Sequence, residues 1–248
     1  VRYERTMLNI KYNGLTEDVD RTYNDVVPSA SVGLKIGQTQ NIRAGYNMRI
    51  CRPSIWYLNP YRNESNPTSV SYGNPDLDTE KSHAFNISYS SFTAKFNVNV
   101  SLRHSFNNNS IERYSFRDEN DIINNTYANI GQSRNTGMSL YLNWNASPKT
   151  RIYMNANGGY SVYKSPDQGI NNDGWDLFVY GGIQHTLPYE IRLSLNLMGA
   201  TPRTTLQGKY DGFTNYNFSV NKSFLNKRLT GSAFASNIFS EYRKSKST

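Results

Sequence analysis

The sequence lacks the features that define several common classes of protein. It contains one cysteine, Cys51, in 248 residues, which excludes an internal disulfide framework and a cysteine-based zinc site. Its three histidines, His83, His104 and His185, are far apart and have no helical metal-ligand spacing. No apolar run approaches the roughly 18 to 20 residues of a membrane-spanning helix. A chain of this kind could span a membrane only as a β-barrel.

Charge is also scarce. Charged residues make up 19% of the chain, below the roughly 25% of ordinary soluble domains. The net charge is +8, but the lysines and arginines are dispersed rather than clustered, which argues against nucleic-acid binding. In place of charge there are 19 tyrosines, 11 phenylalanines and 32 asparagines. Such aromatic content argues against disorder, so the sequence indicates a folded chain that is polar without being strongly charged.

Hydrophobic residues recur with a period of two. In residues 92–103 an apolar residue stands at every second position, and polar residues fill the positions between them. The same alternation runs through 42–50, 138–145 and 191–197. Only an extended strand separates two such sets onto opposite faces. With no stretch of helical periodicity, the pattern predicts an all-β fold.

Eleven strands follow from this pattern. Most exceed the 5 or 6 residues usual for globular strands, and they reach or pass the roughly 9 to 11 residues of a tilted membrane strand. Their expected ranges are 2–13, 27–37, 41–51, 82–91, 92–104, 126–146, 150–163, 174–186, 190–201, 213–224 and 229–239.

The connections between these strands alternate between short and long. The expected short turns are 38–40, 90–92, 147–149, 188–189 and 225–228, and the expected long loops are 14–26, 52–81, 105–125, 164–173 and 202–212. Outer-membrane barrels keep this rule, with short periplasmic turns and long extracellular loops. Aromatic residues near strand ends agree with interfacial girdles, although aromatic packing at the rims of a soluble β core would look similar. These residues are Tyr12, Phe106, Tyr163, Trp175, Tyr189, Phe213, Phe224 and Phe239.

The motif-bearing part of the chain lies between two of the expected strands. A strand ends in Arg49-Ile50-Cys51-Arg52-Pro53, a loop carries Leu58-Asn59-Pro60, and Gly73-Asn74-Pro75-Asp76-Leu77 precedes the next strand. Together with Ser236-Asn237-Ile238-Phe239 near the end, this pattern resembles the outer-membrane β-barrel family of TonB-dependent-receptor-like proteins. Cys51 stands where a small polar residue is expected in that family.

The resemblance implies a fold class and a set of partners. The fold is an antiparallel up-and-down transmembrane β-barrel segment of about 11 strands, within a barrel of about 22 strands. Residues 1–248 would form a single segment of a longer chain, without the plug domain and final strands, and 241–248 would begin an extracellular loop. The expected partners are outer-membrane lipid, a plug domain of the same parent chain, a TonB-type energy-coupling complex, and a small-molecule, glycan or peptide ligand. No nucleic acid is expected.

The motif also has a purely physical interpretation. Pro53 ends a strand because it lacks an N–H, and Asn59-Pro60 and Gly73-Asn74-Pro75 are turn signals, so the motif specifies an ordered loop. Direct ligand binding is the alternative role of this region, and its candidate residues are Arg49, Arg52, Trp56 and Tyr57.

Basic side chains occupy the polar strand faces. In a barrel they would line the interior, where they could favour anionic substrates, pair with an acidic plug, or simply solvate an aqueous passage. These residues are Lys35, Arg43, Arg49, Lys95, Arg103, Arg151 and Arg192.

Signatures of catalysis are poor, so we expect no enzyme, no cofactor and no metal. The acidic stretches 118–121 and 167–176 lack the spacing of an EF-hand loop. The pairs Gly158-Gly159 and Gly181-Gly182 lie within strands, so no phosphate loop follows. The resulting hypothesis is an outer-membrane transporter or receptor wall for nutrient uptake. The alternatives are a passive porin-like barrel, a soluble secreted glycan-binding module, and a surface glycosidase with two carboxylates in a cleft.

Overall fold

The chain folds almost entirely into β-strands. The computed structural model describes residues 1–11, 19–205, 208–225 and 228–238. The strands before the middle of the chain are β1 (Arg2–Ile10), β2 (Val19–Val27), β3 (Ser29–Ile36), β4 (Gln40–Cys51), β5 (Asn63–Asn66), β6 (Ser69–Ser71), β7 (Glu80–Phe92) and β8 (Phe96–Arg117). The later strands are β9 (Ile123–Ser147), β10 (Thr150–Ser165), β11 (Ile170–Thr186), β12 (Ile191–Ala200), β13 (Arg203–Thr205), β14 (Gly208–Tyr210), β15 (Phe213–Phe224) and β16 (Leu229–Ser236). The helical elements are α1 (Ile55–Leu58), η1 (Pro166–Gln168) and η2 (Pro188–Glu190).

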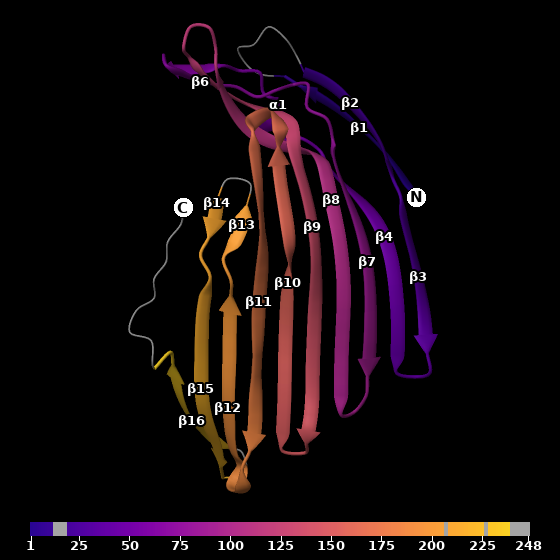
Figure 1. The fold of residues 1–248 in the computed structure, drawn as a ribbon, viewed down its shortest axis with the longest axis vertical. Coiled ribbons are helices and arrows are strands. Elements are labelled where there is room, and N and C mark those ends of the chain that lie inside the picture. The colour runs from indigo at the N-terminus through magenta and orange to yellow at the C-terminus, as the bar shows by residue number, and fades with distance from the viewer. Residues whose placement is uncertain (12–18, 206–207, 226–227, 239–248) are drawn as a thin grey trace.

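Ten of these strands form one antiparallel meander. Their order is β16-β15-β12-β11-β10-β9-β8-β7-β4-β3, so strands that pair are neighbours along the main path of the chain (Figure 1). β6 joins the sheet through a parallel contact with β9 and pairs with β5, while β1–β2 and β13–β14 form separate hairpins. The expected up-and-down antiparallel architecture is therefore confirmed.

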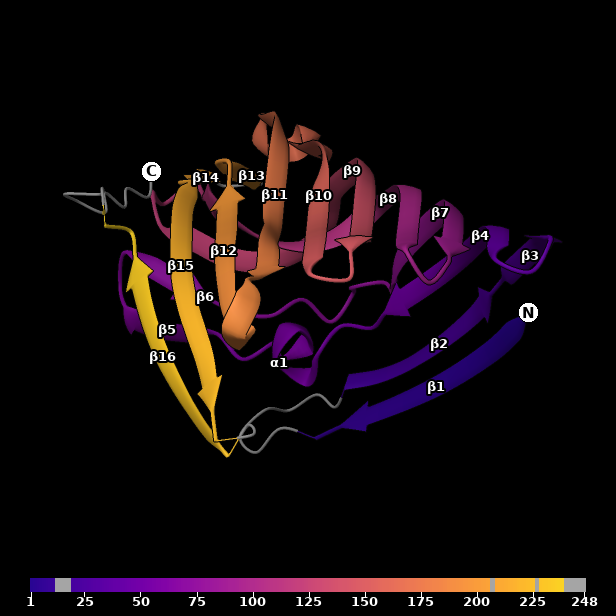
Figure 2. The same cartoon turned by 90° about the horizontal axis from the view of Figure 1, so that it is seen from below.

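The meander curves into an open arc. Figure 2 shows the arc end-on, with α1 and β5–β6 on its concave side and the β1–β2 hairpin near its β3 end. Within the described residues β3 pairs only with β4, and β16 pairs only with β15, so the sheet is not closed. Each end of the arc thus presents a backbone edge of the kind that a complete barrel pairs.

The strand register places the alternating apolar residues of the stretches named from the sequence on one face of the sheet. One row across the sheet runs Leu34–Ile42–Tyr89–Val100–Leu140–Ala156–Val179. A lower row runs Phe96–Trp144–Ile152–Ile183–Leu195–Phe218. Many of these side chains are solvent-exposed although they are large and apolar, among them Ile183 and Phe218. The rows form one continuous apolar band, as lipid-facing strands require.

The opposite face is polar over the same strands. Behind the centre of the apolar band, one row of this face runs Arg43–Ser88–Ser101–Ser139–Asn157. A second row runs Asn41–Ser90–Asn99–Tyr141–Asn155. Strand residues that the sequence analysis named as basic, such as Arg103 and Arg151, lie on this polar face according to the register. Amide, hydroxyl and phenol groups therefore dominate one side of a single-layer sheet.

A small packed core lies at the long-loop end. Leu58 and Leu77 are almost fully buried, and Tyr23 donates a hydrogen bond from its hydroxyl to the carbonyl of Leu77 at 3.1 Å. The inward side chains Val19 and Val27 of β2 are also buried. This core joins the segment between β4 and β7 to the β1–β2 hairpin. No helix in the described part of the chain has the length and apolarity to cross a membrane.

The predicted loop over 14–26 is wrong from residue 19 onward, where β2 begins. The period of two is present, because Val19, Tyr23 and Val27 are buried while the residues between them point outward or are charged. The sequence pattern does not show this strand because the charged residues Arg21 and Asp25 interrupt the apolar set. Their charges are neutralised only by groups distant in sequence, which local patterning does not show.

The other long loops are more structured than the sequence predicted. β8 and β9 extend through most of the expected loop 105–125, leaving 118–122 as the connection. The expected loops 52–81 and 202–212 contain α1, β5 and β6, and β13 and β14, respectively. The turn expected at 90–92 lies at 93–95. All eleven predicted strands correspond to strands of the structure, although the residues expected to continue past 11 and 238 lie outside the described residues.

Candidate functional site

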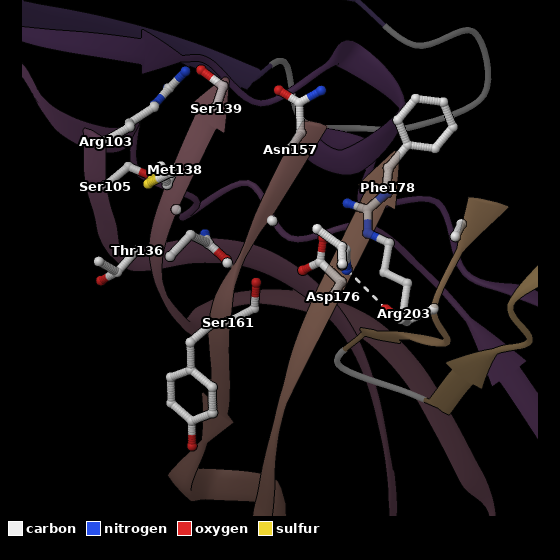
Figure 3. A pocket seen from close by; sticks show the side chains of 18 of the residues that line it. Arg103, Ser105, Thr136, Met138, Ser139, Asn157, Ser161, Asp176, Phe178 and Arg203 are labelled. Atoms are coloured by element: carbon white, nitrogen blue, oxygen red, sulfur yellow. Dashed lines mark hydrogen bonds between the residues drawn. The ribbon is translucent and has the colours of Figure 1, made fainter. Parts of the chain in front are cut away.

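A cavity lies on the polar side of the sheet, near the long-loop edge of the apolar band. It has a volume of about 830 Å³ and is formed by β8 to β11 with residues that follow β12. Figure 3 shows Arg103 on one side of the cavity and Asp176 and Arg203 on the other. Its polar lining includes Ser101, Arg103, Ser105, Ser139, Asn157, Asp176 and Arg203. The arrangement can offer many hydrogen bonds and a few charges to a polar ligand.

The middle of this cavity has no side chains, because two glycines face each other there. Gly137 and Gly159 are directly paired between β9 and β10. A Cβ atom on Gly159 would lie 2.6 Å from the carbonyl oxygen of Thr136 and 2.8 Å from the Cα of Gly137. The strands can approach this closely only while Gly159 has no side chain. The sequence placed Gly158-Gly159 within a strand, but it did not show which strand lies opposite.

The loop between β4 and β7 is held by backbone hydrogen bonds that close around α1. The N–H of Gly73 donates to the carbonyl of Asn59 at 2.7 Å, and the N–H of Asn74 donates to the carbonyl of Tyr57 at 2.6 Å. Pro53, at the end of β4, is buried. These bonds join the two halves of the sequence motif, which is what an ordered loop requires.

The asparagine side chains of the motif brace the same loop. Asn59 accepts a hydrogen bond from the N–H of Tyr61 at 3.0 Å. Asn74 accepts from the N–H of Asp76 at 2.9 Å and donates to the carbonyl of Tyr127 on β9, also at 2.9 Å. Both residues thus form the local side-chain-to-backbone turns that suit asparagine before proline.

Glycine at position 73 is required by space. A Cβ there would lie 2.5 Å from the carbonyl oxygen of Tyr57 and 2.6 Å from that of Asn59. We expect Gly73→Ala to destabilise the loop by about 1–3 kcal/mol, because backbone atoms would have to move apart. Limited proteolysis of the protein in outer-membrane vesicles would detect faster cleavage within 54–79. Gly33→Ala is the matched control, since its added Cβ meets no atom closer than 3.9 Å; equal cleavage of both variants would contradict this account.

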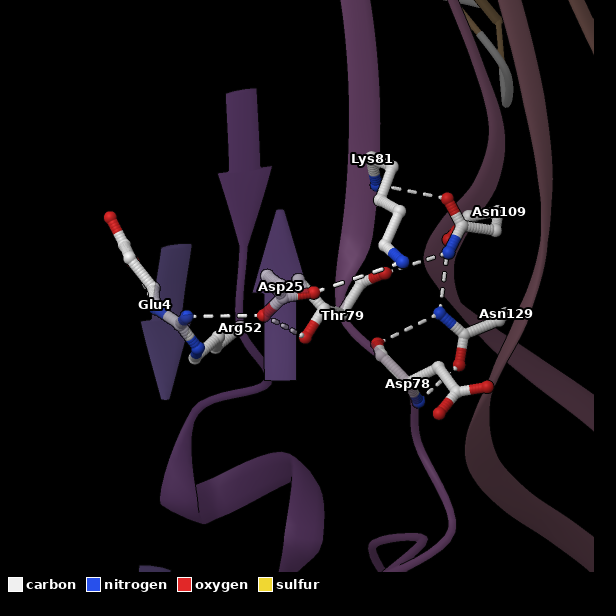
Figure 4. A network of polar contacts seen from close by, with 8 residues as sticks. All are labelled: Glu4, Asp25, Arg52, Asp78, Thr79, Lys81, Asn109 and Asn129. Atoms are coloured by element: carbon white, nitrogen blue, oxygen red, sulfur yellow. Dashed lines mark hydrogen bonds and ion pairs between the residues drawn. The ribbon is translucent and has the colours of Figure 1, made fainter. Parts of the chain in front are cut away.

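A charged network attaches the β1–β2 hairpin to β4 and β7 (Figure 4). Arg52 donates to Glu4 Oε2 at 2.9 Å and to Asp25 Oδ2 at 3.1 Å. Asp25 is only 3% exposed, and it also accepts from the hydroxyl of Thr79 at 3.3 Å and lies 3.8 Å from Lys81 Nζ. Such a buried carboxylate persists because several donors compensate its charge.

The four residues proposed as ligand contacts do not form one cluster of free side chains. Arg52 is committed to Glu4 and Asp25. Tyr57 stacks on Tyr127, with ring centroids 4.4 Å apart. Arg49 is exposed on β4, on the polar face by register with Ser82. Trp56 is 75% exposed on α1, which makes it the most available aromatic side chain of the four.

Two acidic side chains of the long-loop end have shifted pKa values. Asp118 accepts hydrogen bonds from the N–H groups of Asn120 and Ile122, at 2.9 and 3.0 Å, and these donors lower the pKa of its carboxyl. Burial raises the pKa of Glu112, and the neighbouring carboxylate of Glu80 raises it further. Within the described ranges no three histidine, cysteine or acidic residues are grouped so that they could hold a metal ion.

Solved structures with the same fold are outer-membrane receptors and transporters. The siderophore receptor PirA from Pseudomonas aeruginosa matches with a TM-score of 0.63 and 14% identity, over 91% of this chain and 41% of that protein. The ferric enterobactin receptor PfeA from the same organism gives 0.64 and 13%, over 87% and 35%. The outer membrane transporter YddB from Escherichia coli gives 0.56 and 13%, over 90% and 38%. At such identities the likeness establishes the fold, and the chain spans about two fifths of these proteins.

A family model settles the membership that the loop motif suggested. A comparison with curated protein sequences found no match. The model of the outer membrane protein beta-barrel family, however, matches residues 1–248. The resemblance to TonB-dependent-receptor-like barrels is thereby confirmed, and the soluble glycan-binding alternative has no support. The chain belongs to the outer membrane protein beta-barrel family, and its location is the cell outer membrane.

Proposed function

We propose that this chain forms part of the wall and the extracellular loops of an active transporter that captures a small ligand outside and passes it along the polar face. The observation that carries the proposal is that one face of the sheet is a continuous apolar band while the opposite face is polar and holds a cavity of about 830 Å³. A wall without transport would need the band but not a hollow lined by convergent polar groups.

Two further features support capture at the long-loop end. Trp56 exposes most of its ring on α1, which is fixed by the hydrogen-bonded loop around Gly73. An exposed aromatic ring on a rigid support can stack on a ligand with little loss of conformational entropy. Arg49 and Tyr57 stay candidates for the same role. The relatives described as siderophore and ferric enterobactin receptors support a small-molecule ligand, while a glycan or a peptide is also compatible with this surface.

Active transport further requires partners outside the described strands. We infer a plug domain that would fill the interior and a TonB-type complex that would supply energy, both on the basis of family resemblance. A passive porin-like barrel is the competing proposal. It needs neither partner, so its flux would not depend on metabolic energy.

Uptake measurements can separate these proposals. Cells that produce the natural protein would be fractionated, and heat-modifiable gel mobility would report the folded barrel. Uptake of a catecholate iron chelate, a maltooligosaccharide and an oligopeptide would then be measured one at a time, with and without a protonophore. We expect protonophore-sensitive uptake of one probe, reduced in Trp56→Ala. Uptake that persists with the protonophore would favour the passive barrel, and no difference from cells lacking the protein for any probe would contradict transport of these ligand classes.

A further inference from the structure

A second cavity lies at the opposite end of the polar face, beside the short turns. It has a volume of about 730 Å³ and is formed by the turns after β7 and β9 and by the nearby ends of β9 to β12. Four cationic side chains line it: Lys95, Lys149, Arg151 and Arg192. The other lining residues include Asn145, Gln184 and Thr186, and none of the lining residues in the described structure is acidic.

Backbone hydrogen bonds hold each of the two lysines of this basic pocket in place. The N–H of Asn145 donates to the carbonyl of Lys95 at 2.8 Å, and its side-chain amide donates to the carbonyl of Ala94 at 3.1 Å. The N–H of Thr186 donates to the carbonyl of Lys149 at 2.8 Å. The turn between β7 and β8 is therefore hydrogen-bonded to β9, and the turn between β9 and β10 is hydrogen-bonded to β11. These bonds fix the positions from which both lysine side chains extend.

The two arginines lie on either side of β11. Arg151 on β10 is paired with Gln184, and Arg192 on β12 is paired with Thr186, two residues further along the same face of β11. Arg151 donates from Nε to Asn143 Oδ1 at 2.6 Å, and its guanidinium lies 5.6 Å from the ring centroid of Tyr153. Arg151 is held through its Nε and through one face of its guanidinium, so its terminal N–H groups can donate to the oxygens of an anion.

The absence of counter-charges in this pocket contrasts with the other end of the molecule. At the long-loop end Arg21, Arg52 and Arg117 each pair with a carboxylate. Among the residues that the structure describes, no ion pair joins Lys95, Lys149, Arg151 or Arg192 to an acidic group. Four like charges around one hollow repel each other, and a bound anion relieves that repulsion.

We propose that this basic pocket binds a small anion through a phosphate or carboxylate group. This proposal adds a ligand class to the proposed function. It rests on that function in one respect, namely that a transported ligand reaches this end of the polar face. It names the chemical group recognised there, an oxyanion with two or more acceptor oxygens. Charge complementarity and the forked geometry of two guanidinium groups are the physical reasons.

Calorimetric titration of the natural protein, purified in a phosphate-free detergent, tests the site directly. The probes are inorganic phosphate and, in a parallel titration, acetate. We expect saturable binding of at least one of them, weakened about tenfold or more when Arg151→Gln and Arg192→Gln are combined, because two charges next to the anion are lost. Added NaCl should weaken binding further, because salt screens these charges. Phosphate binding alone would identify a phosphate site, and binding of both probes a general oxyanion site.

The matched control removes the same charge elsewhere on the polar face. Lys35→Gln combined with Arg43→Gln changes β3 and β4, outside the basic pocket, and should leave the affinity within about twofold of the natural protein. Heat-modifiable mobility would confirm that both double variants fold. No saturable binding of either anion, or equal weakening in both double variants, would overturn the proposal. Binding without energy-dependent uptake would contradict the transport proposal alone, and uptake without binding would contradict the anion site alone.

Discussion

Replacing Val100 with arginine is expected to destabilise the folded protein in lipid by about 2–4 kcal/mol, the cost measured for a cation at the bilayer midplane on the lipid-facing side of a barrel. Val100 belongs to the central row of the apolar band, between Tyr89 of β7 and Leu140 of β9. On β8 the band residues Phe96 and Val98 lie between Val100 and the short turn, and Leu102 lies on its other side, so an arginine at position 100 could reach an interface only past other apolar side chains.

The neighbouring residue supplies the control. Asn99 precedes Val100 on β8, so its side chain points to the polar face, opposite Tyr141 and Ser90. Asn99→Arg should change stability by less than about 1 kcal/mol, because an aqueous interior solvates the added charge. Both variants would be unfolded with guanidinium chloride in lipid vesicles, with tryptophan fluorescence as the readout. Similar midpoints for the two variants would show that the two faces are not divided between lipid and water.

The second large effect is expected from Arg52→Met. The change leaves the carboxylate of Asp25, which is 3% exposed, with only the Thr79 hydroxyl and the more distant Lys81 ammonium as partners. Removing one partner of a buried ion pair typically costs 3–5 kcal/mol; because the arginine is 21% exposed and Lys81 remains, we expect about 2–3 kcal/mol. The loss should be local, because this network attaches the β1–β2 hairpin to the main sheet.

Hydrogen exchange of the β1 and β2 amides would measure that loss. Faster exchange in the hairpin, with unchanged exchange in β9 and β10, is the expected result. Adding Asp25→Asn to Arg52→Met should restore part of the protection, because the buried charge is removed together with its partner. Arg117→Met breaks an ion pair that is 62% and 81% exposed, and it should change stability by less than about 0.5 kcal/mol. Equal exchange in both arginine variants would show that the network does not hold the hairpin.

These predictions divide according to how far apart in the chain their residues lie. The contrast between Val100 and Asn99 could be stated from sequence, because side chains of a strand alternate regardless of context. The network of Arg52 could not, because Glu4, Asp25 and Thr79 approach it from three other segments. Nothing in the spacing of these residues indicates that a charged residue of β2 points inward.

The candidate sites show the same division. The turn residues around Gly73 were recognisable from proline, glycine and asparagine, whose backbone preferences are local. The sequence also identified the basic residues of the polar face. It did not show that hydrogen bonds from Asn145 and Thr186 would bring Lys95 and Lys149 to the same hollow as Arg151. A cluster depends on which strands are neighbours and on the register between them.

The sequence by itself determined that the chain is an antiparallel barrel wall with one apolar and one polar face, because a period of two and alternating turn lengths are local properties. Only the tertiary structure decided which polar groups meet: that Arg52 is used to hold the β1–β2 hairpin, and that four cations gather at the short-turn end. The physical reason is that Coulomb and hydrogen-bond interactions act over a few ångströms in space, whatever the distance along the chain.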